Sequence, residues 1–158
     1  MLDLHAEMLG AYRANLVTLE ALLLGIDAER ARQRPAAESW SIVEVVAHLA
    51  DTEERAHARV RRMLSEDEPL IEGYDEQALA AEHRYHEMNL GEALARFKTE
   101  RAAQLATLEA LDADGWGRAA VHNEFGPITI GSLTELMVTH DTIHLAQIAR
   151  ILLGRLEA

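Results

Sequence analysis

Apolar residues recur every three or four positions in four long segments of this 158-residue chain. The segments run from Leu2 to Leu24, from Ile42 to about Ser65, from Leu90 to Leu111 and from Ser132 to about Leu153. This spacing puts apolar side chains on one stripe of an α-helix, so each segment predicts a helix with one buried face. Four such helices, each about 33 Å long at about 1.5 Å per residue, predict an all-α four-helix bundle. We expect a single domain over residues 1–158, because this length suits one hydrophobic core.

Polar residues mark where three of these helices begin. Ser41 followed by Glu44 is typical of a capping box, and Asn89 is a favourable cap before the third segment. Ser132 has the same spacing to a later Glu and predicts the start of the last helix, with Thr129 as the alternative cap.

The connections between the predicted helices differ in length. Residues 66–88 are polar, contain a predicted short helix from Asp75, and are numerous enough to span the bundle lengthwise. They predict a long crossover link between helices two and three. Residues 112–127 hold three glycines and an extended Ala119–Val121 stretch, which predicts a loop or a small hairpin.

The charge balance restricts the partners. The chain has 15 Lys and Arg against 27 Asp and Glu, a net charge of −12. A nucleic acid or an anionic membrane surface would require clustered basic residues, so we expect neither as a partner. The first residues lack the pattern of a signal peptide and no apolar run is long enough to span a membrane, so we expect a cytoplasmic protein.

The chain has no Cys and eight His. This composition excludes disulfides, cysteine nucleophiles, iron–sulfur clusters and thiolate-bound zinc. Any transition metal must therefore bind through imidazole and carboxylate groups.

His140 and His144 lie four residues apart in the middle of the apolar stripe of the last predicted helix. This spacing places both rings on one face, where they can converge on one ion. Two buried neutral rings need partners, and a shared metal would satisfy both. The pattern alone leaves a pair of hydrogen-bonded core histidines as an equal alternative. His48, near the middle of the second predicted helix, favours the metal, although by itself it could be a half-exposed side chain.

Two stretches carry a family resemblance. WSIVEVVAHLAD at residues 40–51 and HDTIHLAQI at residues 140–148 closely resemble the two signature helices of the DinB-like, damage-inducible metalloprotein family. The resemblance covers nearly the whole chain. It implies a metal site made by His48, His140 and His144, with zinc, nickel or iron as occupant, in a bundle with non-sequential helix order that is often a homodimer.

The resemblance also implies classes of activity. Characterised members include thiol S-transferases that join a low-molecular-weight thiol such as bacillithiol to electrophiles, and mycothiol-dependent maleylpyruvate isomerases. Three imidazole ligands leave a coordination position open, where a thiol or a water can lose its proton. We therefore expect a metal-dependent thiol S-transferase acting on a small electrophile, with a metal-dependent hydrolase as the first alternative. The second alternative is a non-catalytic metal- or ligand-binding stress protein.

Further residues are candidates for supporting roles. Four polar side chains near the histidines could orient the rings or a bound water: Glu44, Asp51, Asp141 and Gln147. Tyr74 and Arg101 are candidate substrate contacts, and Trp40 is expected to pack at a helix entrance. The remaining central histidines are expected at the surface: His57, His83, His86 and His122.

Overall fold

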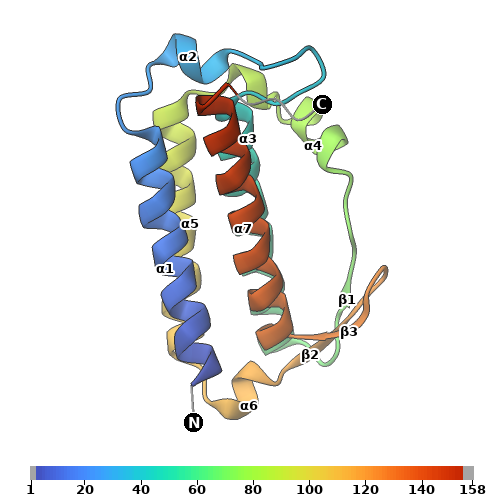
Figure 1. Ribbon diagram of the computed structural model, residues 1–158. Coiled ribbons are helices and arrows are strands. Elements are labelled where there is room, and N and C mark those ends of the chain that lie inside the picture. Colours follow the sequence, from blue (N-terminus) through green and yellow to red (C-terminus); the bar gives the residue numbers. More distant parts are fainter. Residues whose placement is uncertain (1–2, 155–158) are drawn as a thin grey trace.

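The computed structural model describes residues 3–154, and four long helices form most of it (Figure 1). They are α1 (Leu4–Leu23), α3 (Ile42–Ser65), α5 (Leu90–Glu109) and α7 (Ile130–Leu152). The four-helix bundle predicted from the apolar spacing is confirmed. The predicted start at Leu2 lies outside the described residues.

The helix starts follow from side-chain caps. The Ser41 hydroxyl accepts from the Glu44 backbone N–H, and the Glu44 carboxylate accepts from the Ser41 backbone N–H, which completes the predicted capping box. Asn89 caps α5 as predicted. Thr129 rather than Ser132 caps α7, because its hydroxyl accepts from the Ser132 backbone N–H at 3.1 Å. The start predicted at Ser132 was wrong and its alternative is confirmed.

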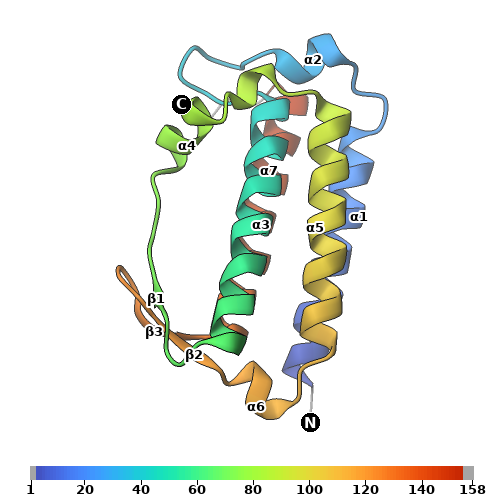
Figure 2. The same ribbon diagram turned by 180° about the vertical axis from the view of Figure 1, so that it is seen from behind.

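The helices do not pack in sequence order. Helix α3 packs against α5 and α7, whereas α1 packs against α7 and α5. Helices α3 and α5 run in the same direction, opposite to α1 and α7 (Figures 1 and 2). Two parallel neighbours need a connection that returns along the whole bundle, and residues 66–89 supply it on the outside of α3 and α7. The predicted crossover is confirmed.

A small sheet anchors this crossover. Strand β2 (Ala119–His122) pairs antiparallel with β3 (Gly126–Thr129), which confirms a small hairpin in this region. Strand β1 (Leu70–Ile71) from the crossover pairs in parallel with β2, giving the order β1-β2-β3. The sequence did not predict β1, because a two-residue strand is too short to show a periodic pattern.

Four short helices complete the described chain: α2 (Ala28–Arg32), α4 (Glu76–Glu82), the 3₁₀ turn η1 (Tyr85–Glu87) and α6 (Ala113–Trp116). Only α4 was predicted, and Asp75 caps it. Within residues 3–154, no helix combines the length and the apolar character that crossing a membrane requires.

The buried apolar side chains form two clusters, one toward each end of the bundle. The first includes Val45, Phe97 and Ile148, and the second includes Val60 and Ile130. Buried polar side chains occupy the middle of α3, α5 and α7 between these clusters: His48, Asp51, Glu53, Arg101, Gln104, Asp141 and His144. This polar layer contains the candidate site.

Candidate metal centre

Three histidines from two antiparallel helices converge in the polar layer. His48 comes from α3, and His140 and His144 lie one turn apart on α7. Their ring centroids are 4.5–5.0 Å apart. One nitrogen from each ring lies within 4.8 Å of the other two, and the Nε2 atoms of His48 and His140 are 3.0 Å apart. The structure therefore brings together the three residues that the sequence singled out.

The surroundings of His48 and His144 keep these two rings neutral. His48 is 1% exposed. Burial, followed by the neighbouring His144 ring, lowers the pKa of His48 to about 3. Burial and the neighbouring His140 ring also lower the pKa of His144. Neutral imidazoles carry the free lone pair that a metal ion needs, so His48 and His144 are in the right protonation state at neutral pH.

Gln147 defines the tautomer of one ring. The Nδ1 atom of His144 lies 2.8 Å from the side-chain oxygen of Gln147, which accepts the Nδ1 hydrogen. The Nε2 lone pair of His144 is therefore free to face the other two rings. Of the four proposed orienting residues, Gln147 is the one that contacts a ring of the trio in the described residues.

The spacing of the nitrogens fits a metal ion. Zinc binds imidazole nitrogen at about 2.05 Å, which places two ligands of a tetrahedral site about 3.3 Å apart. The separation of 3.0 Å between His48 and His140 needs only a small adjustment to reach this value. The donor set of three nitrogens also suits nickel and iron, since imidazole binds all three metals. The residues present therefore fit a divalent transition metal.

A carboxylate that the sequence analysis missed faces the trio. Oε1 of Glu76, in the first turn of α4, lies 3.8 Å from Nε2 of both His48 and His140. The nearby His140 ring lowers the pKa of Glu76, with a smaller contribution from His48, so its carboxylate is ionised at neutral pH. No local pattern identifies Glu76, because only the crossover link brings α4 beside the middle of α3 and α7.

Trp40 packs against the same cluster. Its ring centroid lies 4.9 Å from that of His48 and 6.3 Å from those of His144 and Tyr85. The residue precedes the Ser41 cap, as expected for packing at a helix entrance. It covers the side of the trio that faces the start of α3.

Glu44 and Asp51, two proposed orienting residues, have other partners. Burial alone would raise the pKa of Glu44, but hydrogen bonds from Arg34 and Ser41 outweigh it and lower the pKa. Asp51 accepts from the Tyr85 hydroxyl of η1 at 2.7 Å and also contacts Arg96 on α5 and His83 at the end of α4. Glu44 holds the start of α3, and Asp51 ties the middle of α3 to α5 and the crossover, so neither contacts a ring of the trio in the described residues.

Asp141 and Arg101 belong to a separate buried network. Arg101 is 0% exposed, so the expected substrate contact is wrong. Its guanidinium donates two hydrogen bonds of 2.8 Å to Glu53, one of 2.7 Å to Asp141 and one of 2.9 Å to the Tyr12 carbonyl oxygen. These contacts join all four long helices. Asp141 follows His140 in the sequence, but its side chain points to α5 because it lies about 100° further around α7.

The expectation that the other central histidines lie at the surface is wrong for two of them. His57 and His122 are buried, each only 5% exposed, and not at the surface as predicted. His57 Nε2 lies 3.1 Å from the Thr107 hydroxyl, and His122 Nδ1 accepts from the Glu124 backbone N–H. His83 and His86 are partly or largely exposed. The interhelical contact and the hairpin that bury His57 and His122 leave no simple mark in the sequence.

A cavity of about 220 Å³ opens beside the trio. Its wall includes His140 and Glu76, so a molecule inside it can reach the histidines. Tyr74, a candidate substrate contact, also lines it. Apolar side chains form much of the remaining wall: Phe125, Leu133, Leu136 and Met137.

Known proteins share sequence and fold with this chain. The chain is 28% identical over 112 residues to a protein of Oceanobacillus iheyensis named "Putative metal-dependent hydrolase OB0782". The match covers 71% of this chain and 64% of that relative, so the chain spans less than two thirds of its length.

Solved structures share the fold. YfiT from Bacillus subtilis, described as "a probable metal-dependent hydrolase with an unusual four-helix bundle topology", superposes with a TM-score of 0.84 at 22% identity. This superposition covers 93% of this chain and 85% of YfiT. The mycothiol-dependent maleylpyruvate isomerase superposes with a TM-score of 0.75 at 13% identity, over 94% of this chain and 63% of the isomerase. The DinB superfamily model matches residues 11–148, most of the chain, and this chain therefore belongs to the DinB superfamily.

Proposed function

We propose that this protein is a metal-dependent hydrolase in which His48, His140 and His144 hold a divalent ion and Glu76 is the general base. The position of Glu76 carries the proposal, because its carboxylate oxygen lies 3.8 Å from Nε2 of two of the three histidines. A carboxylate beside an open metal position is where hydrolysis needs a proton acceptor.

The metal and the protein divide the chemistry. A divalent ion held by three neutral imidazoles supplies Lewis acidity and makes a bound nucleophile easier to deprotonate. Glu76 accepts the proton, and its lowered pKa keeps it ionised and ready to do so at neutral pH. Gln147 holds His144 in the tautomer that presents Nε2. Zinc and nickel are our first choices for the ion, with iron as the third.

The relatives support the same reaction class. OB0782 is named, and YfiT is described, as a metal-dependent hydrolase. The cavity beside the trio combines apolar side chains with polar and charged ones, among them Arg59, Glu76 and His140, and is suited to a small acyl compound that also carries a polar group.

Thiol transfer is the second candidate. The chain has no Cys, so a sulfur nucleophile would arrive as a low-molecular-weight thiol, and Glu76 could take its proton as well as that of water. The isomerase that shares the fold is mycothiol-dependent. Glu76 serves both reactions, and it is the metal-dependent hydrolases among the relatives that place hydrolysis ahead of transfer, in the reverse of the order expected from the sequence.

An esterase assay tests the proposal. Zinc-loaded protein should hydrolyse 4-nitrophenyl acetate, and Glu76→Gln should lower kcat by about 10²–10⁴-fold, the usual contribution of a general base. Zinc content, measured by elemental analysis, should stay at one ion per chain. Glu72→Gln, which changes an exposed carboxylate on the same crossover, is the matched control and should keep wild-type kcat.

Several outcomes distinguish the candidates. An unchanged kcat in Glu76→Gln would remove the general base from the mechanism. Conjugation of monobromobimane that requires both zinc and an added thiol, without ester hydrolysis, would favour the transferase. Zinc-loaded protein that is inert in both assays would favour a metal- or ligand-binding role.

A further inference from the structure

An arginine lies on the wall of the cavity that reaches the histidine trio. Arg59, on α3, lines the 220 Å³ cavity together with His140 and Glu76. It also lines an adjoining groove of about 600 Å³ between α3 and the crossover, and Gly73 and Tyr74 are likewise common to both spaces. Arg59 is eleven residues from His48 on the same helix, about 16 Å along its axis.

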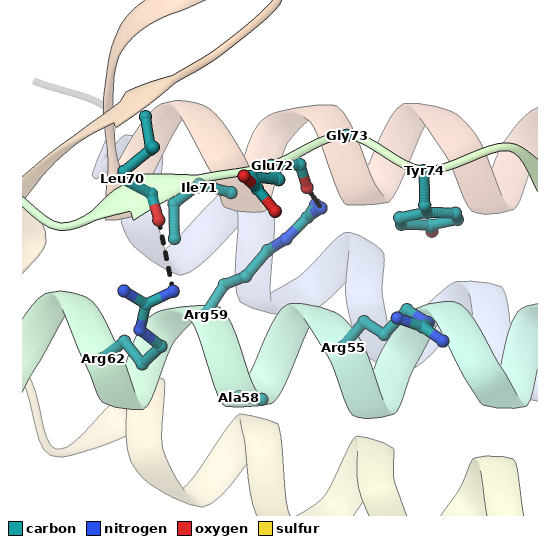
Figure 3. A pocket seen from close by; sticks show the side chains of 9 residues that line it. All are labelled: Arg55, Ala58, Arg59, Arg62, Leu70, Ile71, Glu72, Gly73 and Tyr74. Carbon is teal, nitrogen blue, oxygen red and sulfur yellow. Dashed lines mark hydrogen bonds between the residues drawn. The ribbon is translucent and has the colours of Figure 1, made fainter.

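Three arginines follow one another along this groove, and they differ in their partners (Figure 3). Arg62 pairs with Glu66 at 2.8 Å and also donates to the Leu70 carbonyl oxygen. Arg55 lies 3.6 Å from Asp51. In the part of the chain that the structure describes, Arg59 has no carboxylate within the 4.0 Å ion-pair distance.

The charge of Arg59 is only partly compensated. Its guanidinium donates to the Glu72 carbonyl oxygen at 2.6 Å and lies over the Tyr74 ring, 5.4 Å from its centroid. Burial and the neighbouring Arg55 lower the pKa of Arg59, although Tyr74 and Glu124 oppose this effect. A half-buried guanidinium without an ion-pair partner, beside a cavity, is suited to bind an anion that enters it.

We propose that Arg59 determines substrate specificity by pairing with a carboxylate of the substrate, whose reacting group lies at the histidine trio. The substrate class is then a small acyl compound with an apolar chain and a terminal carboxylate. The apolar wall accommodates the chain, since Leu133 and Met137 line the cavity that Arg59 and His140 also reach. This inference rests on the proposed function for the location of the reaction, but not for the binding itself.

The distance between Arg59 and the trio sets a lower limit on the length of the substrate. Arg59 lies about 16 Å from His48 along α3, so a short dicarboxylate cannot reach from one to the other, even with the arginine side chain extended toward the trio. The cavity and the adjoining groove share Arg59, Gly73 and Tyr74, so a longer chain has room in the combined space. Glu124 lines the same cavity and its charge acts on Arg59, so an entering carboxylate competes with Glu124 for the guanidinium.

Azelate and nonanoate are the probes, because they have the same nine-carbon length and differ by one carboxylate. Isothermal titration calorimetry on zinc-loaded protein should show azelate binding about 10–100-fold more tightly than nonanoate, the usual range for a charge-assisted hydrogen bond. Arg59→Met should reduce this ratio to about one, and Arg59→Lys should retain part of it. Zinc content and the urea midpoint of both variants should match those of the wild type.

Arg62→Met is the matched control, because Arg62 lines the groove but not the cavity beside the trio. It should keep the wild-type ratio. Equal binding of both probes to the wild type, or a ratio that Arg59→Met leaves unchanged, would overturn the inference. Binding that depends on Arg59 in a protein without hydrolytic activity would instead contradict the proposed function alone.

Discussion

The polar layer contains two clusters that solve the problem of burial in different ways. In the Arg101 network, a cation meets the carboxylates of Glu53 and Asp141, so opposite charges compensate one another inside the protein. In the histidine trio, three like groups face one another and their lone pairs converge. His140 and Asp141 are adjacent in the sequence, yet they belong to different clusters because they lie on different faces of α7.

This difference in charge indicates a structural role for the Arg101 network and a binding role for the histidine trio. In the Arg101 network one guanidinium joins two carboxylates from different helices, and none of these three residues lines the cavity beside the trio. Three adjacent imidazole rings would repel one another if they were protonated. In the neutral state their ring nitrogens need partners, and an external metal cation can supply one for all three. Burial of polar groups by itself therefore does not identify a site. What identifies the trio is that its groups are of one kind and that one of them, His140, lines a cavity.

Removing the cation of the Arg101 network should have the largest effect. Arg101→Met leaves the carboxylates of Glu53 and Asp141 buried without a counter-charge, which should reduce the free energy of unfolding by about 3–5 kcal/mol. Urea denaturation at pH 7 measures this loss. Arg96→Met, which breaks half-exposed ion pairs to Asp51 and Glu54, is the control and should cost less than about 1 kcal/mol. If both variants lost a similar amount of unfolding free energy, the Arg101 network would not differ from ordinary half-exposed ion pairs.

Metal binding to the trio should have the next largest effect. At a free zinc concentration one hundred times the Kd, the wild type should gain about 2.7 kcal/mol in unfolding free energy. His144→Ala should gain nothing and should lose stoichiometric zinc. For each protein, the unfolding free energy with zinc is compared with that of the same protein without zinc, because removing the His144 ring also changes the stability of the metal-free protein.

His57→Gln is the control for this experiment, since His57 is also buried on α3 but lies outside the trio. It should bind one zinc per chain and show the wild-type gain. Zinc retained at full stoichiometry in His144→Ala would contradict the proposed ligand set.

Acid should destabilise the metal-free protein through the trio, with a smaller effect per pH unit. Folding lowers the pKa of His48 to about 3 from its usual value of about 6.5, so the unfolded chain takes up the proton first. The contribution is therefore complete above about pH 6.5 and is lost as the pH falls toward 3. Its slope approaches about 1.4 kcal/mol per pH unit for this one group.

Urea denaturation of chelator-treated protein between pH 7 and pH 4.5 measures this slope. His48→Gln should be less sensitive to pH than the wild type, because glutamine does not titrate. If the unfolding free energy of both proteins changed in the same way with pH, the folded state would not hold His48 neutral. The trio would then not differ from the Arg101 network as a cluster of uncharged groups.

Local sequence patterns predicted much of the fold and the central site residues. Apolar spacing predicted four helices, and the caps at Ser41 and Asn89 predicted where two of them begin. The spacing of His140 and His144 placed both rings on one helix face. These predictions held because helix periodicity and capping depend on residues only a few positions apart.

Other features depended on contacts between distant segments. Glu44, Asp51 and Asp141 were proposed to orient the trio, but the choice of partner for a carboxylate depends on which helix lies opposite it. Arg101 was taken for a substrate contact, because no sequence pattern shows that one side chain joins four helices.

The sequence by itself determined a four-helix bundle with His140 and His144 in the apolar stripe of its last helix, since both features follow from the period of a helix, and the family resemblance added His48. Only the tertiary structure decided that Glu76 faces the trio and that Arg59 lines the adjoining cavity. Both depend on the crossover, which returns along the bundle and lies over α3. The physical reason is that a link without periodicity takes its position from the surfaces on which it packs.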